Sequence, residues 1–275
     1  MCPSCGSLVG VRDEKCYTCG RSNPGLWGFA PALRNLGVNF GFAPTVIGIC
    51  VTLWVVMLLL SGGGIGTGNI LSALSPSPAV LFLFGESGAV PVFGAGRWWT
   101  VLSAGWLHAG LLHIGMNMYF LYMMGPAITD LFGPARTVII YTIGGVAGFL
   151  LSSLAGLLLS WMPLPFLQPG AFTVGASAPL FGLIGALFHY GRTMSSAVKQ
   201  QAVSIMVQAV IFGLFVHGID NYAHLGGFAG GYLTSAFLNP MSRERGDHML
   251  IALICLIATF LSIVASVVTG LQLFR

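Results

Sequence analysis

The sequence predicts an all-α, polytopic membrane protein with a small cysteine-rich module at its N-terminus. Of its 275 residues, 56% are hydrophobic and only 7% are charged, whereas soluble proteins carry about 25% charged residues. Asp, Glu, Lys and Arg are absent from residues 35–85, 137–191 and 248–274. A helix needs about 20 residues to cross roughly 30 Å of hydrocarbon, so each of these stretches is long enough to span a bilayer.

Apolar blocks between loop signals place seven membrane-spanning helices along the chain. The uncharged stretch 137–191 must hold two of them, because Pro163, Pro165 and Pro169 interrupt it and proline removes backbone donors that lipid cannot replace. The fourth span is therefore short. In chain order the expected spans cover residues 44–61, 111–128, 138–160, 177–191, 200–217, 222–238 and 249–271.

Basic residues set the predicted orientation. With a cytoplasmic N-terminus, nine of the 11 lysines and arginines fall on the cytoplasmic side, leaving only Arg97 and Arg275 outside. The net charge of +4 follows from this topology, and no basic patch with interleaved aromatics indicates a nucleic-acid partner. Residues 1–23 lack a cleavable signal pattern. We therefore expect a multi-pass plasma-membrane protein with an extracytoplasmic C-terminus.

Four cysteines near the N-terminus form two CxxC pairs, each followed by glycine and separated by ten residues. Four thiolates at this spacing suit tetrahedral zinc, with iron as the alternative metal. Disulfides are the other interpretation, but they are rare in the reducing cytosol, where the predicted orientation puts this module. Metal binding would supply the folding energy of so small a unit, which could also dock a cytosolic partner. The predicted structural zinc ligands are Cys2, Cys5, Cys16 and Cys19.

Polar side chains inside the predicted spans are candidates for function, because they are costly in a bilayer. His113 and Asn117 lie four residues apart, on one face of the second helix. In the predicted orientation the second, fourth and sixth helices all enter from the outer side. Ser177, in the first turn of the fourth helix, and His224, near the start of the sixth, are then expected at the same depth as His113 and Asn117.

These four residues suit acyl transfer inside the membrane. Ser177 would be the nucleophile and His224 its general base, as in serine hydrolases that dispense with a third residue. The Asn117 amide, the His113 imidazole and the Ser177 backbone N–H are suitable donors to an oxyanion. We expect His108 to be structural, bonding the preceding loop.

Each of these residues also has a purely structural interpretation. Ser177, followed by Pro179, fits a helix N-cap, while His224 and Asn117 could be hydrogen-bonded packing residues. Asp220 is disfavoured as a third catalytic member, because we expect it in an exposed turn. Other histidines lie elsewhere: His189 is about 18 Å along the helix from Ser177, and His217 and His248 are expected at solvated span ends.

Glycines give an independent indication that the fourth and sixth helices meet. Gly182 and Gly185 could face Gly227 and Gly231, a pairing of small residues that lets two helix backbones approach closely. Close approach would bring Ser177 against His224.

Three motifs in order resemble those of the rhomboid intramembrane serine proteases. They read His108-x4-His113-x3-Asn117, Gly175-x-Ser177 and Ala223-His224-x2-Gly227-x3-Gly231. The resemblance covers roughly residues 44–240 and implies a Ser177–His224 dyad, an oxyanion site at His113 and Asn117, and no catalytic cofactor. It also implies a six-helix core, here with a seventh C-terminal helix, a first outer loop lying partly in the membrane, and cleavage of single-span substrates near their outer end.

Further positions agree with or depart from the family pattern. Phe181, four residues after the serine, stands where an aromatic residue usually packs on the catalytic imidazole. Ala178 replaces the usual glycine after the serine, and Arg97 precedes Trp98 instead of following a tryptophan, so the anchoring of the first loop is expected to differ. We expect a water-filled cavity open to the outside and substrates with glycine or proline near the cleavage site.

The expected domains are a cytosolic zinc-ribbon-like module, a linker or amphipathic segment, the six-helix core, and a linker with the seventh helix. Two alternatives to a protease remain. One is an inactive rhomboid-like binder of transmembrane partners, although this chain keeps both serine and histidine. The other, a metal transporter using His108, His113 and His224, predicts acidic ligands in the spans, and the sequence has none there. The domains cover residues 1–24, 25–43, 44–240 and 241–275.

Overall fold

A computed structural model describes residues 2, 4–10, 13–25, 41–66, 73–162, 168–215 and 218–273. Within these ranges the protein is helical and has no strands, which confirms the predicted all-α class. One long helix corresponds to each of the seven predicted spans. They are α2 (Phe42–Ser61), α5 (Leu111–Phe132), α6 (Pro134–Leu158), α7 (Ser177–Thr193), α8 (Ser196–Phe215), α9 (Asn221–Phe237) and α10 (Gly246–Leu273).

Three segments of the described chain are long and apolar enough on their own to cross a membrane: Phe42–Gly64, Pro134–Leu158 and Gly246–Leu273. By contrast, α7 and α9 have 17 residues each. At 1.5 Å per residue each extends only about 26 Å, less than the hydrocarbon thickness. The residues just before α7, Thr173, Gly175 and Ala176, are buried by protein, as irregular backbone at membrane depth must be.

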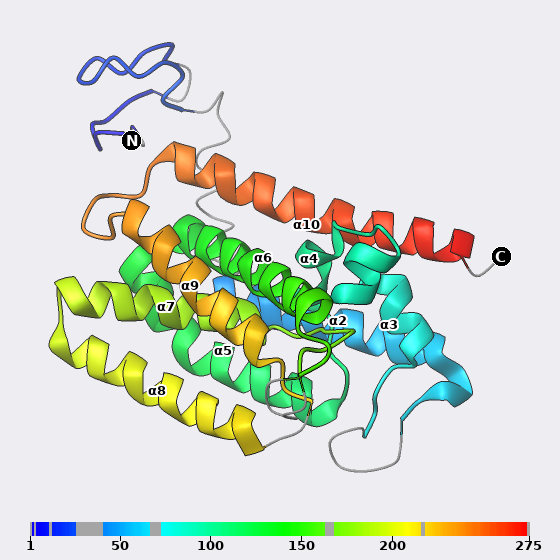
Figure 1. The fold of residues 1–275 in the computed structure, drawn as a ribbon. Helices are drawn as coiled ribbons and strands as arrows, with labels where there is room; N and C mark the ends of the chain where they lie inside the picture. Colours follow the sequence, from blue (N-terminus) through cyan, green and yellow to red (C-terminus); the bar gives the residue numbers. More distant parts are fainter. Residues whose placement is uncertain are drawn as a thin grey trace.

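The first loop is defined here as residues 73–110 of the segment between α2 and α5, and it contains four short helical elements. These are α3 (Pro78–Phe84), a π-helical turn at Val90–Gly94, α4 (Thr100–Ser103) and a 3₁₀ turn at Ala104–Trp106. Both α3 and α4 pack against α10, which lies on the outside of the bundle (Figure 1). The first loop is therefore a folded subdomain of the helical core.

The centre of the molecule is formed by α6, α7 and α9, which pack on one another through glycines. A Cβ atom at Gly231 would collide with the Gly182 carbonyl, and one at Gly185 would collide with the Phe228 carbonyl. The fourth and sixth spans thus meet at the glycines that the sequence indicates. At the same place Gly144 of α6 lies against Gly182, where a Cβ would be 2.8 Å from the Gly182 Cα and 3.4 Å from the Gly227 carbonyl.

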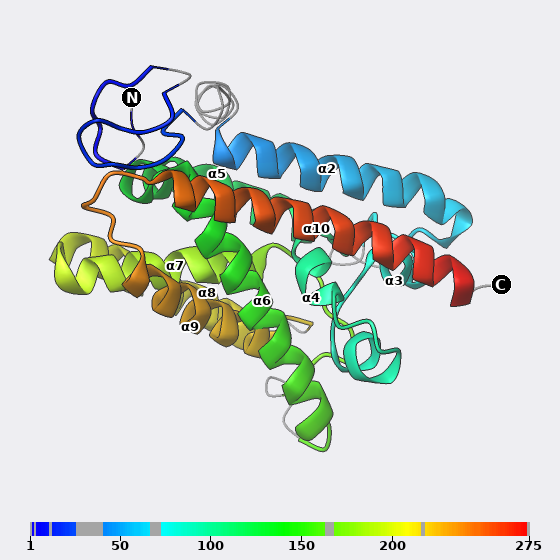
Figure 2. The same ribbon diagram turned by 90° about the horizontal axis from the view of Figure 1, so that it is seen from above.

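Helix α10 crosses α6 and begins beside the cysteine module (Figure 2). The Arg21 guanidinium of the module lies 3.1 Å from the Asp247 carboxylate in the first turn of α10. Arg136 at the start of α6 is buried and donates to the Ser242 and Arg243 carbonyls and to His248 Nδ1. His248 lies at a span end, in the first turn of α10, where it is partly exposed and also accepts this bond from Arg136. His217 lies outside the described residues, as does most of the linker 25–43.

Candidate active site

Ser177 is the first residue of α7 and is half-buried. Ala176 takes the N-cap position and no side chain caps this helix, so the alternative in which Ser177 serves as the N-cap does not describe the structure. Pro179 lies in the first turn, where its missing N–H breaks no hydrogen bond. The Ser177 hydroxyl is therefore left unused by the helix it begins.

The His224 imidazole lies against the first turn of α7. Phe181, one turn after Ser177, stacks on it with ring centroids 4.1 Å apart and planes inclined by 12°. One turn along α9 from His224, a Cβ at Gly227 would collide with the Ala178 carbonyl. No hydrogen bond joins Ser177 to His224 among the described residues, although nucleophile–base bonds are commonly long in substrate-free enzymes.

Asp220 does not serve as a partner for His224. Its carboxylate accepts from the Ala223 backbone N–H at 2.9 Å and from the Ser152 hydroxyl. The expected exposed turn is wrong, because Asp220 is half-buried and caps α9. The His224 Nδ1 atom is buried and has no partner in the described part of the chain, which is the pattern of a dyad and not of a triad.

His113 of α5 packs directly under the residue that leads into α7. A Cβ atom at Gly175, whose φ is +127°, would collide with His113 Nε2, so this position requires glycine for both space and backbone conformation. His113 Nδ1 accepts from the Ala109 N–H at 3.4 Å. In a neutral ring the proton then sits on Nε2, which faces Gly175.

Asn117 and His108 complete the group. The Asn117 side-chain amide donates one hydrogen bond to the His113 carbonyl at 3.0 Å, which leaves its second N–H available. His108 is fully buried, and its Nε2 accepts from the Ala176 N–H at 3.4 Å. His108 therefore binds the segment next to Ser177, a structural contact that the sequence does not indicate.

Helix α6 supplies a contact that the sequence interpretation missed. A Cβ atom at Gly148 would lie 2.8 Å from Ala178 Cβ and 2.5 Å from the Ala223 carbonyl. Ala178 follows Ser177 and Ala223 precedes His224, so one glycine sets the separation of both. The sequence indicates this close helix contact through Gly144, Gly145 and Gly148, which lie at helical spacing. His189, as predicted, lies elsewhere, edge-on to Tyr232.

The four N-terminal cysteines form a compact cluster. Their sulfur atoms all lie within 4.8 Å of one another, with Cys2 to Cys19 at 3.7 Å and Cys5 to Cys16 at 3.5 Å. Sulfurs about 2.3 Å from one tetrahedral zinc would be roughly 3.8 Å apart, so the donor set fits this ion. The four residues are free cysteines. Gly6 and Gly20 close the two turns with positive φ angles.

Comparison with known proteins identifies the family. The model of the rhomboid domain matches residues 95–241, more than half of the chain. The chain belongs to the rhomboid family. This rhomboid is 35% identical over 165 residues to RHOMBOID-like protein 4 of Arabidopsis thaliana, covering 58% of this chain and 39% of that protein. It is 29% identical over 164 residues to the rhomboid protease GluP of Bacillus subtilis, covering 58% of this chain and 30% of that protein.

The rhomboid spans about a third of the length of these curated relatives. The family match leaves the cysteine module, α2, α3 and α10 uncovered. The cysteine module lies before residue 95, and α10 lies after residue 241. Family membership supports a multi-pass membrane protein. The roles of individual residues, and of the uncovered elements, depend on the geometry of this chain.

Proposed function

We propose that this rhomboid is an intramembrane serine endopeptidase that uses Ser177 as nucleophile and His224 as general base. The observation that carries the proposal is the stack of His224 on Phe181, because it holds the imidazole against the turn that begins with Ser177. The close contact of Gly227 with the Ala178 carbonyl supports the same placement from the backbone.

In the proposed reaction His224 takes the Ser177 proton as the hydroxyl attacks the substrate carbonyl, and later delivers it to the leaving amine. The oxyanion would accept hydrogen bonds from His113 Nε2, the free Asn117 N–H and the Ser177 backbone N–H at the start of α7. Loss of one such donor costs about 10²–10³ in kcat in comparable sites. Water then hydrolyses the acyl-enzyme.

The substrates proposed here are transmembrane segments of single-span proteins, cleaved near their outer end. A helical peptide bond hides its carbonyl in an i to i−4 hydrogen bond, so the substrate must unwind locally, and glycine or proline near the scissile bond would favour this. We place the protein in the plasma membrane with a cytoplasmic N-terminus, because the distribution of basic residues favours that orientation.

We further propose that residues 1–24 form a structural zinc module, followed by a linker at 25–43, a protease core at 44–240 and the α10 region at 241–275. The sulfur spacing supports zinc. Catalysis itself draws on no metal in this mechanism, and the exposed face of the module would be available to a cytosolic partner.

The test is cleavage of a single-span reporter in liposomes by the wild type, Ser177→Ala and His224→Ala, with His189→Ala as the matched control. His189 is a histidine of α7 in contact with Tyr232, remote from Ser177. Both active-site variants should lose at least about 10³-fold in kcat, while the control stays at the wild-type rate. A folded wild type that neither cleaves several reporters nor reacts with a fluorophosphonate would favour the inactive binder of transmembrane partners.

A further inference from the structure

Helix α10 is bonded to the first loop by two buried serines one turn apart. The Trp99 indole N–H donates to the Ser266 hydroxyl at 3.1 Å, and the Ser262 hydroxyl donates to the Trp99 carbonyl at 2.6 Å. Both serines are buried. Two opposed hydrogen bonds to one residue fix both the distance and the orientation of Trp99 relative to α10.

Arg97 adds a third connection between the same elements. Its guanidinium, 1% exposed, donates to the Ser266 carbonyl at 2.6 Å and to the Phe82 carbonyl of α3 at 2.7 Å. A buried charge is costly unless it is hydrogen-bonded, and charge-assisted bonds are the strong ones. Charge counting assigns Arg97 to the outer side of the membrane, and the structure buries it within the protein between α3 and α10, so the displaced arginine has its own anchoring role.

The first loop is in turn bonded to the segment that leads into Ser177. Ser87 and Thr173 exchange backbone hydrogen bonds of 3.0 and 2.8 Å. The Gly175 N–H donates to the Ala104 carbonyl at 3.0 Å. The first loop therefore bonds the backbone of 171–176 at Ala171, Thr173 and Gly175, while the Ala176 carbonyl accepts from the Leu180 N–H of α7.

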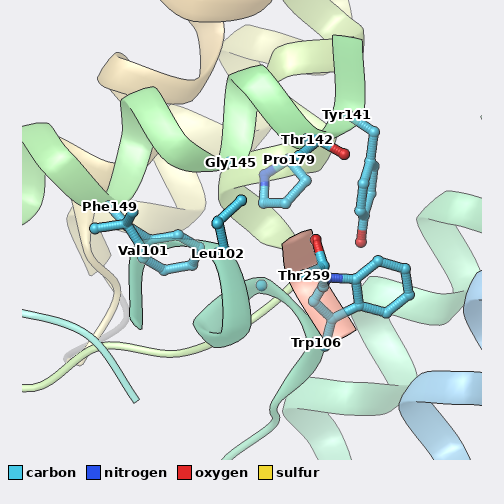
Figure 3. Close-up of a pocket in the computed structure, with 10 residues that line it drawn as sticks. Val101, Leu102, Trp106, Tyr141, Thr142, Gly145, Phe149, Pro179 and Thr259 are labelled. Carbon is cyan, nitrogen blue, oxygen red and sulfur yellow. The ribbon is translucent and has the colours of Figure 1, made fainter. Parts of the chain in front are cut away.

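A small cavity lies where these elements meet. Thr259 of α10, Trp106 of the first loop, Tyr141 of α6 and Pro179 of α7 all line it (Figure 3). Pro179 is two residues from Ser177. One turn of α10 before the Ser262 contact, Thr259 thus lines the same cavity as Pro179 in the first turn of α7, together with residues of the first loop and of α6.

We infer that α10 is a positioning element of the active site. Through Ser262 and Ser266 it holds Trp99 and Arg97, and through the first loop it holds residues 171–176 and the register of Ser177. This inference rests on the proposed function for its catalytic consequence, and α10 lies outside the residues matched by the rhomboid family model. The seventh helix is then part of the catalytic unit of this protein.

The experiment compares the wild type with Ser262→Ala/Ser266→Ala and with Trp99→Phe, which removes the indole donor without altering α10. Thr269→Val is the matched control, because the Thr269 hydroxyl donates within α10 only. Two quantities are measured on each full-length protein in detergent. They are kcat and KM for a single-span reporter, and hydrogen exchange of peptides covering 171–176, with α8 peptides as an internal reference.

The double variant should lose about tenfold in kcat with KM unchanged, since small misplacements of reacting groups have effects of this order. The backbone amides of residues 171–176 in the double variant should exchange faster than in the wild type, while those of α8 are unaffected. Trp99→Phe should show the same pattern more weakly. Thr269→Val should match the wild type. Unchanged exchange at 171–176, or acceleration spread equally over α8, would overturn the inference. A wild type that does not cleave refutes the proposed function instead, and the exchange result still decides the coupling.

Discussion

The proposed catalytic centre and α10 are held in the bundle by different means. Between α6, α7 and α9 the contacts are backbone against backbone, at Gly148, Gly227 and Gly231. Helix α10 is held by polar side chains, with buried arginines at both ends: Arg136 near its start and Arg97 near its last turns. In a membrane neither contact gains from the hydrophobic effect, so van der Waals packing and hydrogen bonding must hold the helices together.

The two kinds of contact should differ in how well they tolerate amino-acid substitutions. A glycine contact leaves no space for another atom, so any added side chain must separate the helices. The side-chain hydrogen bonds that hold α10 are separate and directional, so the loss of one bond leaves the others in place. Substitutions in the glycine contacts should therefore abolish activity or leave it unchanged. Substitutions of the side chains that hold α10 should reduce activity by intermediate amounts.

Among substitutions in the packing contacts, the largest effect is expected for Gly227→Ala. Its Cβ would collide with the Ala178 carbonyl, moving His224 away from the first turn of α7. Reporter cleavage should fall by about 10²-fold or more. Gly48→Ala in α2 is the control, since nothing lies within 4 Å of a Cβ there. A Gly227→Ala protein that cleaves normally would show that the glycine contact does not set the site.

A smaller effect is expected at Phe181. Phe181→Leu keeps an apolar side chain but removes the ring that stacks on His224. Aromatic pairs are worth about 0.5–1.5 kcal/mol beyond buried area, so kcat/KM should fall about 2- to 10-fold. Phe181→Tyr keeps the stack and should restore the rate. Equal activity of the Leu and Tyr variants would argue against a role for stacking.

The stability of the folded protein should depend on pH through Glu86, a residue of the first loop near Arg97. Burial raises the pKa of this carboxyl to about 7 from 4.5, against the opposing effect of Arg97. Between these values the folded protein holds more protons than the unfolded chain, so stability falls as pH rises from 4.5 to 7. Thermal unfolding of Glu86→Gln should lose this dependence. A Gln variant that keeps the wild-type slope would assign the effect to another group.

The smallest effect on catalysis is expected from the cysteine module. Cys16→Ser should lose zinc by metal analysis and unfold the module, because thiolate ligands supply its folding energy. Reporter cleavage should change little, since the Arg21–Asp247 pair that joins the module to α10 is partly exposed and such pairs contribute about 0–1 kcal/mol. A large loss of kcat on zinc removal would instead make the module a regulator of the core.

The seven long helices could be predicted from the sequence, because uncharged runs and proline breaks are local signals. Ser177 and His224 could be selected because polar residues are rare in apolar spans. The anchoring of the first loop could not be predicted. Charge counting assigns Arg97 to a side of the membrane but says nothing about burial, and its partners Phe82 and Ser266 are 15 and 169 residues away.

The contacts of His108 and Gly148 at the candidate active site also could not be predicted from the sequence. The sequence singles out His108 as structural, yet its partner, the Ala176 N–H, lies 68 residues away. Gly148 belongs to a visible glycine cluster, but its contacts with Ala178 and Ala223 exist only once three helices are assembled. Local patterns indicate which residues matter, whereas tertiary packing decides what they touch.

The most direct test of the Ser177–His224 dyad is the site of fluorophosphonate modification, mapped by peptide mass spectrometry in the wild type and in His224→Ala. We predict one adduct, on Ser177, that is lost in His224→Ala while His189→Ala retains it. An adduct on another serine, or full modification of Ser177 without His224, would contradict the account.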